Sequence, residues 1–269
     1  MLTIASASGN IFAYVWEDQV PPAFDGAKWA QALCPRELGL GLDGLFLLHR
    51  PASGKPWLIE HWDLDGACTF CGNGTRAALA IPGAPSAGLV EALSNGQSVA
   101  LRRQENGIAL RMPEGSGYGF LTSPLSLQFP HACAWIGNPQ LILEVPSVAE
   151  VDLAGFAPPL RHHEAFPQGT NVCIVEIQAP GRARIRSWER GVEGETLSCG
   201  TGSAVAGAWL ARRTGIPRWL FQPSGRDAVR VDTEILPDGN WRELWLSGPV
   251  RVLGEFHPAG GLLLSAQES

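Results

Sequence analysis

The chain carries the same short motif twice. Cys71-Gly-Asn-Gly recurs as Cys199-Gly-Thr-Gly, and the two cysteines stand 128 positions apart. A Gly-Asn pair keeps the same spacing, because Asn10 and Asn138 each precede the cysteine of their half by 61 positions. A period of 128 residues is too long for a solenoid repeat. We therefore expect two pseudo-symmetric domains of one fold, over residues 1–120 and 121–269, with the boundary in a turn-rich segment.

The composition agrees with two globular domains. A length of 269 residues allows each domain its own core, and 45% hydrophobic with 17% charged residues is typical of folded proteins. A formal net charge of −6 and the lack of a Lys/Arg-rich patch argue against a nucleic-acid partner. We recognise neither a secretory signal nor an apolar run long enough to span a membrane, so we expect a cytoplasmic protein with no membrane partner.

Turn-forming residues divide each half into hairpins and a few helices. Hairpins around few helices indicate an α+β fold with sheets that wrap helices, not a doubly wound parallel sheet. We expect strand pairs at 98–103 with 108–112, 171–177 with 183–188 and 229–235 with 241–247, and helices at 29–38, 75–80 and 203–213.

Each motif cysteine directly precedes an expected helix. The first N–H groups of a helix lack internal partners and lie at the positive end of its dipole, so they can bind a carboxylate and lower the pKa of a thiol. One such motif could equally be a structural turn. Two motifs that meet at one ligand suit inversion of a carbon next to a carboxylate, because one thiolate removes the α-proton and the other thiol returns a proton to the opposite face.

This chemistry predicts no cofactor and no metal. A pyridoxal phosphate Schiff base needs a lysine, and the only two lysines, Lys28 and Lys55, lie outside the motifs. Cys68 and Cys71 form a lone Cys-x-x-Cys with no second pair to complete a zinc site. The other cysteines are expected to be small buried hydrophobic residues.

The ordered motifs resemble the diaminopimelate epimerase family along most of the chain. The matching segments are Gly9-Asn10, Gly41-Leu-Asp43-Gly44, Asp65-Gly66, Cys71-Gly-Asn-Gly-Thr-Arg, Gly137-Asn138-Pro139, Gly169-Thr-Asn171-Val, Trp188-Glu-Arg-Gly191, Gly194-Glu-Thr196 and Ser198-Cys199-Gly-Thr-Gly-Ser203. The resemblance implies two similar domains, each a barrel-like mixed sheet around a central helix, with the site between them. It also implies an isomerase of lysine biosynthesis, and a homodimer is one assembly to test because several members form one.

The resemblance further implies roles for single residues toward a small amino acid substrate. Cys71 and Cys199 would be the catalytic acid–base pair. The amides of Gly72, Asn73, Gly200 and Thr201 would hold the α-carboxylate, Glu189 the α-ammonium, and Asn138, Asn171 and Arg190 the distal end of the substrate, with Asn10 and Asp63 as further substrate-binding positions.

Three departures from the family pattern concern the substrate. Asp63 stands where the family usually has asparagine, Gln140 where it has histidine, and Ile11 where it has aspartate. A carboxylate at position 63 would repel a distal carboxylate, so a racemase for a cationic amino acid such as histidine, lysine or ornithine is the alternative to an enzyme that converts LL- to meso-diaminopimelate.

Two other classes of protein fit less well. A non-catalytic protein could use the paired helix ends to bind an amino acid or another anion, and it would exchange no α-proton. An isomerase of the phenazine-biosynthesis type shares the two-domain fold but lacks the paired cysteines, which argues against it.

Overall fold

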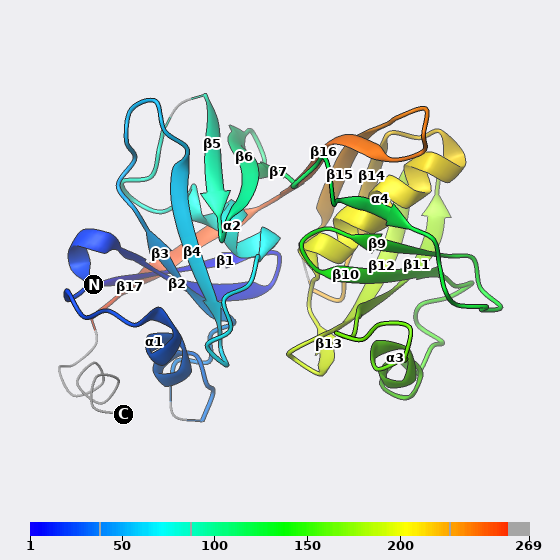
Figure 1. Cartoon of the computed structure of the whole chain (residues 1–269), viewed down its shortest axis with the longest axis horizontal. Coiled ribbons are helices and arrows are strands. Elements are labelled where there is room, and N and C mark those ends of the chain that lie inside the picture. The colour runs from blue at the N-terminus through cyan, green and yellow to red at the C-terminus, as the bar shows by residue number, and fades with distance from the viewer. Residues whose placement is uncertain (38, 87, 226, 258–269) are drawn as a thin grey trace. The chain divides into compact units, whose positions relative to one another are not determined.

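The structure is a computed structural model that describes residues 1–37, 39–86, 88–225 and 227–257. The chain divides into two compact units (Figure 1). Unit 1 comprises Met1–Leu110 and the segment that starts at Pro249, whereas unit 2 comprises Arg111–Gly248.

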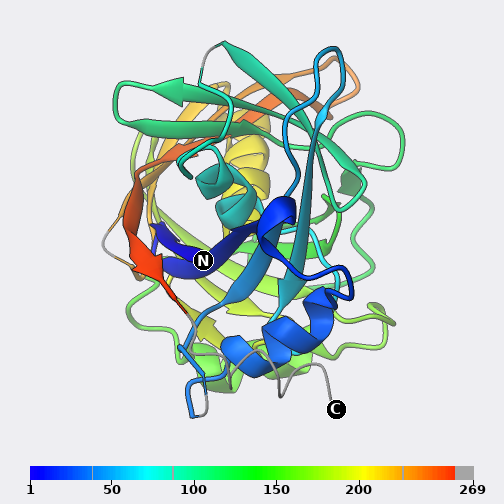
Figure 2. The same cartoon turned by 90° about the vertical axis from the view of Figure 1, so that its left-hand side faces the viewer.

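Unit 1 is built from strands of mixed direction around one short, buried helix. β2 and β3 are parallel, as are β4 and β5, whereas β1 pairs antiparallel with β2 and β17, β3 with β4, and β5 with β6. Figures 1 and 2 show the strands curving around α2. The elements of unit 1 are β1 (Leu2–Ala7), β2 (Asn10–Trp16), a 3-10 turn (Glu17–Gln19), α1 (Gly26–Leu33), β3 (Gly44–Leu48), β4 (Trp57–Asp63), α2 (Gly72–Ala78), β5 (Leu89–Ser94), β6 (Gln97–Gln104), β7 (Gly107–Arg111) and β17 (Val250–Phe256).

Unit 2 repeats this plan around a longer helix. α4 packs against strands β10, β11, β14, β15 and β16, and its residues are buried from Gly200 to Ala211. The elements of this unit are β8 (Gly119–Leu121), β9 (His131–Trp135), β10 (Pro139–Glu144), α3 (Leu153–Arg161), β11 (Asn171–Ala179), β12 (Arg182–Glu189), β13 (Gly194–Thr196), α4 (Gly200–Thr214), β14 (Arg218–Gln222), β15 (Val229–Ile235) and β16 (Trp241–Gly248).

The sequence repeat is a repeat of topology. In unit 1 the pairings β1–β2, β2–β3, β3–β4, β4–β5 and β5–β6 run antiparallel, parallel, antiparallel, parallel and antiparallel. In unit 2 the pairings β9–β10, β10–β11, β11–β12, β12–β14 and β14–β15 follow the same order. The expected α+β fold, with a barrel-like mixed sheet around a central helix in each half, is confirmed.

The expected ranges 1–120 and 121–269 differ from the compact units at two places. The first is the boundary, because the Met112 N–H donates to the Leu244 carbonyl and β8 pairs with β9, so this stretch already belongs to unit 2. The second is β17, which pairs antiparallel with β1 from Leu2↔Phe256 to Ala7↔Val250 and so returns the end of the chain to unit 1.

The helices begin earlier than the sequence pattern predicts. α2 starts at Gly72 and α4 at Gly200, directly after the motif cysteines, because the glycines of each motif are themselves helical. α1 ends at Leu33, short of the expected residue 38, with Cys34 as its C-cap; Pro35 follows directly and has no N–H with which to continue the helix. α4 ends at Gly215, whose φ of 74° closes the helix in the left-handed region that favours glycine.

The second glycine of each motif is required by packing. A Cβ on Gly74 would stand closer than 3.0 Å to the ring of Phe46, and a Cβ on Gly202 equally close to the sulfur of Cys173. Real Cβ atoms essentially never approach other atoms so closely. Each motif therefore seats the first turn of its helix directly on the core.

Within the described ranges, no helix is long and apolar enough to cross a membrane.

Candidate active site

In unit 2 the candidate site is built around Cys199, the N-cap residue of α4. Its sulfur accepts a hydrogen bond from the Gly202 N–H at 3.4 Å and lies 3.5 Å from the Thr201 hydroxyl. The side chain is almost fully buried, at 2% exposure. The helix thus directs one backbone donor at the sulfur, an arrangement that suits a thiol able to carry negative charge.

A second thiol beside Cys199 escaped the sequence analysis. The pKa of Cys199 is raised well above its usual value, first by the hydrogen-bonding interaction with the Cys173 thiol and then by burial, while Thr201 and Gly202 act in the opposite direction. Cys173 is fully buried on β11, and its sulfur lies 3.2 Å from the Ser187 hydroxyl. At neutral pH Cys199 is therefore protonated.

Gln140 joins two of the expected site residues. Its side-chain N–H groups donate to the Asn138 amide oxygen at 2.6 Å and to the Thr201 hydroxyl oxygen at 2.9 Å. The left-handed Gly137, with φ of 87°, turns the chain just before Asn138. The expected positions 138 and 201 are thus held together with Cys199 in one hydrogen-bonded network.

A loop-based part of the site lies where β11 begins and β12 ends. The Asn171 amide oxygen accepts a hydrogen bond from the Arg190 N–H at 2.8 Å, and the Arg190 guanidinium donates to the Gln168 carbonyl at 3.2 Å. The Glu189 carboxylate accepts a hydrogen bond from the Thr196 hydroxyl. Glu189 and Arg190 are half-buried, so unit 2 presents a carboxylate and a guanidinium next to each other.

In unit 1 the equivalent position is Cys71, the N-cap residue of the seven-residue helix α2. Cys71 is half-buried, and Asn73 in the first turn donates from its amide nitrogen to the Asn10 amide oxygen at 2.9 Å. Asn10 follows the turn formed by Ser8 and Gly9, with φ values of 54° and 98°. The expected residues 10, 71, 72 and 73 thus belong to one local cluster.

Arg76 supports this cluster, and its role was not identified from the sequence. Its guanidinium is fully buried and donates to the Ser8 hydroxyl at 2.8 Å and to the Pro249 carbonyl at 3.2 Å. The residue thereby ties α2 to the turn that carries Asn10 and to the start of β17. Its presence in the first motif, where the second motif has Ala204, was the available signal.

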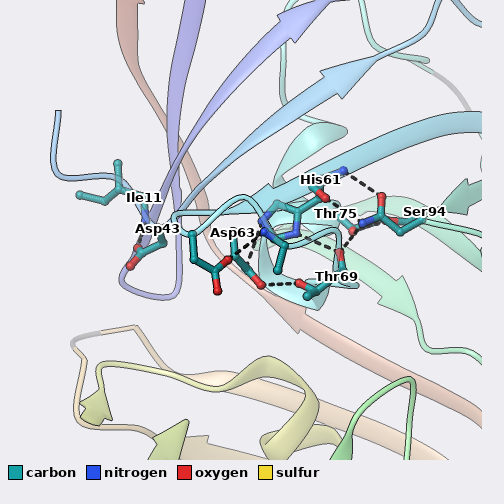
Figure 3. Close-up of polar contacts among 10 residues, drawn as sticks. Ile11, Asp43, His61, Asp63, Thr69, Thr75 and Ser94 are labelled. Carbon is teal, nitrogen blue, oxygen red and sulfur yellow. Dashed lines mark hydrogen bonds and ion pairs between the residues drawn. The ribbon is translucent and has the colours of Figure 1, made fainter. Parts of the chain in front are cut away.

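Asp63 lies at the end of β4 and is engaged by its own unit (Figure 3). One carboxylate oxygen accepts a hydrogen bond from the Thr69 hydroxyl at 2.7 Å, and the other lies 3.6 Å from Nε2 of His61. The His61 Nδ1 lies 3.0 Å from the Thr69 carbonyl, so Nδ1 carries the ring proton. Burial lowers the pKa of His61, opposed by the charge of Asp63, and the side chain of Asp63 remains 40% exposed.

Ile11 takes part in the cluster through its backbone. Its N–H donates to the Asp43 carboxylate at 2.7 Å, and the Asn10 side chain also bonds to that carboxylate. The net effect is a raised pKa for Asp43, because burial outweighs these hydrogen bonds. Asp43, from the Gly-x-Asp-Gly segment, thus supports the Asn10 turn.

The structure therefore groups the expected residues by unit. Unit 1 carries Asn10, Asp63, Cys71, Gly72 and Asn73, and unit 2 carries Asn138, Asn171, Glu189, Arg190, Cys199, Gly200 and Thr201.

The fold is shared with solved structures of low sequence identity. The chain matches a PhzF-family phenazine biosynthesis protein from Bacillus anthracis with a TM-score of 0.69 at 15% identity, over 96% of this chain and 98% of that one. A probable proline racemase from Agrobacterium radiobacter K84 matches with a TM-score of 0.63 at 14% identity, over 96% and 92% of the two chains.

Sequence comparison is more specific. The family model described as diaminopimelate epimerase matches residues 132–218. The diaminopimelate epimerase of Gemmatimonas aurantiaca is 36% identical over 78% of this chain and 79% of its own. That of Xylella fastidiosa strain M12 is 32% identical over 93% of both chains. The chain therefore belongs to the diaminopimelate epimerase family and is an isomerase of the epimerase and racemase type.

Proposed function

We propose that this protein converts LL- to meso-diaminopimelate with Cys71 and Cys199 as its acid–base pair and without pyridoxal phosphate. The observation that carries the proposal is that each motif cysteine caps the helix at the centre of its unit. Relatives that bear the name diaminopimelate epimerase support this substrate.

In the proposed reaction one thiolate removes the α-proton. The resulting negative charge spreads into the α-carboxylate, where backbone N–H groups of the first helical turns stabilise it. The other thiol then delivers its proton to the opposite face of the carbon. Because the pKa of Cys199 is raised, Cys199 starts as the proton donor in the resting enzyme, and the reverse reaction gives it the role of base.

The polar groups of unit 2 support a substrate with an anionic distal end. The side-chain oxygens of Asn138 and Asn171 already accept hydrogen bonds from Gln140 and Arg190, which directs the amide nitrogens of both residues to act as donors. Together with the Arg190 guanidinium they form a donor set suited to a carboxylate. Glu189 would pair with an ammonium group of the substrate.

The second candidate is a racemase for cationic amino acids. It is favoured by the Asp63 carboxylate, whose side chain is 40% exposed and would attract a cationic group. Its bond to Thr69 and its position near His61 reduce this argument, since both oxygens already face groups of unit 1. We expect Asp63→Asn to keep or increase turnover of diaminopimelate. A loss of more than tenfold would favour the cationic substrate.

The experiment is α-hydrogen exchange in heavy water, followed by NMR, with separation of the stereoisomers. LL-diaminopimelate, histidine, lysine and ornithine are each incubated with the protein. Exchange and inversion of diaminopimelate alone support the proposal, and exchange only with the other three replaces it with the cationic racemase. No exchange with any of them would leave a binding protein.

The thiols are tested by Cys71→Ala and Cys199→Ala, each of which should abolish inversion. Cys68→Ala is the matched control, because Cys68 is an exposed cysteine three positions before Cys71. Inversion that survives the loss of either motif cysteine contradicts the two-thiol mechanism.

A further inference from the structure

Gln140 lies at the start of β10, between two neighbouring strands. It pairs with Ala134 of β9 and with Asn171 of β11, and only 1% of its surface is exposed. Its backbone is therefore held from both sides, and its side chain is buried.

Both side-chain N–H donors of Gln140 are committed. One donates to the Asn138 amide oxygen at 2.6 Å and the other to the Thr201 hydroxyl oxygen at 2.9 Å. An amide has no pKa near neutrality, so these two donors remain in place across the pH range in which a thiol titrates. A histidine at this position would change its charge between about pH 5 and 8.

The donor to Thr201 determines what the hydroxyl can do next. A hydroxyl has one proton, and because its oxygen accepts from Gln140, the proton is available to another acceptor. The Cys199 sulfur lies 3.5 Å from that oxygen, and Thr201 is buried. When Cys199 loses its proton, the sulfur therefore receives the Thr201 O–H in addition to the Gly202 N–H, which lies at 3.4 Å.

We propose that Gln140 is a positioning residue for Cys199, which orients the Thr201 hydroxyl so that it donates to the sulfur when the thiolate forms. This rests on the proposed function of Cys199 as an acid–base group. The direction of donation runs from Gln140 to Thr201 and from Thr201 to Cys199, and the same amide fixes Asn138. These hydrogen bonds thus link the orientation of the Asn138 side chain, an expected substrate-binding group, with the ionisation of the Cys199 thiol.

The test is the pKa of Cys199 itself, measured as the pH dependence of its alkylation by iodoacetamide and quantified on the Cys199 peptide by mass spectrometry. Gln140→Met keeps the length of the side chain but removes both donors. We expect this variant to raise the pKa, with alkylation about tenfold slower at a fixed pH below it, which corresponds to one pKa unit.

Thr201→Val should raise the pKa of Cys199 to the same extent, because it removes the hydroxyl and keeps the shape of the side chain. Thr201→Ser keeps a hydroxyl and should retain the wild-type pKa. The double variant should shift no further than Thr201→Val alone, since Gln140 acts through Thr201. Ser203→Ala is the matched control, because the Ser203 hydroxyl donates to the Cys199 carbonyl oxygen, not to the sulfur, and it should leave the pKa unchanged.

An unchanged pKa in folded Gln140→Met, or additive shifts in the double variant, would overturn the inference. If Gln140→Met does not fold, an unchanged pKa in Thr201→Val is sufficient to overturn it. The alkylation assay needs no turnover, so it separates the two proposals. A protein without epimerase activity refutes the proposed function. An active enzyme in which the pKa of Cys199 does not change on substitution of Gln140 or Thr201 refutes only this inference.

Discussion

Gly202→Ala is the substitution that most directly tests the packing at the thiol site. The new Cβ would stand closer than 3.0 Å to the Cys173 sulfur, 3.2 Å from the Cys199 sulfur and 3.3 Å from Oε1 of Gln140. All three neighbours are buried, so none can move into solvent. The helix and the Cys173 strand must therefore separate by a few tenths of an ångström to about 1 Å to restore ordinary van der Waals distances.

The expected cost follows from two opposing terms. Overpacking of a buried site typically destabilises by about 1–3 kcal/mol, whereas alanine in place of glycine favours a helix by up to about 1 kcal/mol. We expect a net loss of about 1–2 kcal/mol in the free energy of unfolding. A misplacement of up to about 1 Å at a reacting group can lower kcat/KM by about a hundredfold, so activity should suffer more than stability.

The assays are urea unfolding and epimerisation of diaminopimelate. Gly207→Ala is the matched control in the same helix, since its Cβ would stand 2.5 Å from a methyl group of Val231, away from the thiols. It should destabilise to a similar extent and reduce kcat/KM much less. Cys173→Ala in the Gly202→Ala background should recover most of the lost stability. Wild-type stability and activity in Gly202→Ala would refute the reasoning.

Two further predictions concern the neighbours of the motifs. Cys173→Ala should lower the pKa of Cys199, because the interaction with Cys173 is the largest cause of its elevation. The limb of the pH–rate profile that reports loss of the Cys199 proton should therefore move to lower pH, and a limb that stays in place contradicts this prediction. Arg76→Met should lower the free energy of unfolding in urea by about 3 kcal/mol, because it removes hydrogen bonds of about 1 kcal/mol each to Ser8, Pro249 and Ile108. A change below about 0.5 kcal/mol would show that the guanidinium does not stabilise the turn at Ser8.

The repeat made much of the architecture predictable. Two copies of one motif order require two copies of one topology, and the strand pairings of the units follow the same sequence of directions. The expected hairpins are found as β11 with β12 and β15 with β16, because period-two patterns flanked by turn residues are local signals.

Contacts between residues far apart in the chain were not predictable in the same way. The pairing of β17 with β1 joins the two ends of the described chain, and no local pattern records such a partner. Cys173 has no special sequence context, and only the register of β10 with β11 and the absence of a side chain at Gly202 bring it to Cys199. Likewise, arginine is rarely buried, so the motif alone does not reveal that Arg76 is fully enclosed and bonded to Ser8 and Pro249.

The return of β17 to β1 has a consequence for biosynthesis. Unit 2 is contained within one continuous stretch of chain, so a ribosome can release it complete, whereas the sheet of unit 1 keeps an open edge at β1 until residues 250–256 emerge. An interrupted polypeptide would thus hold Cys199 in a finished scaffold and Cys71 in an unfinished one. Among the described strands β17 is the last in sequence, so the sheet of unit 1, which carries Cys71, is completed after unit 2, which carries Cys199.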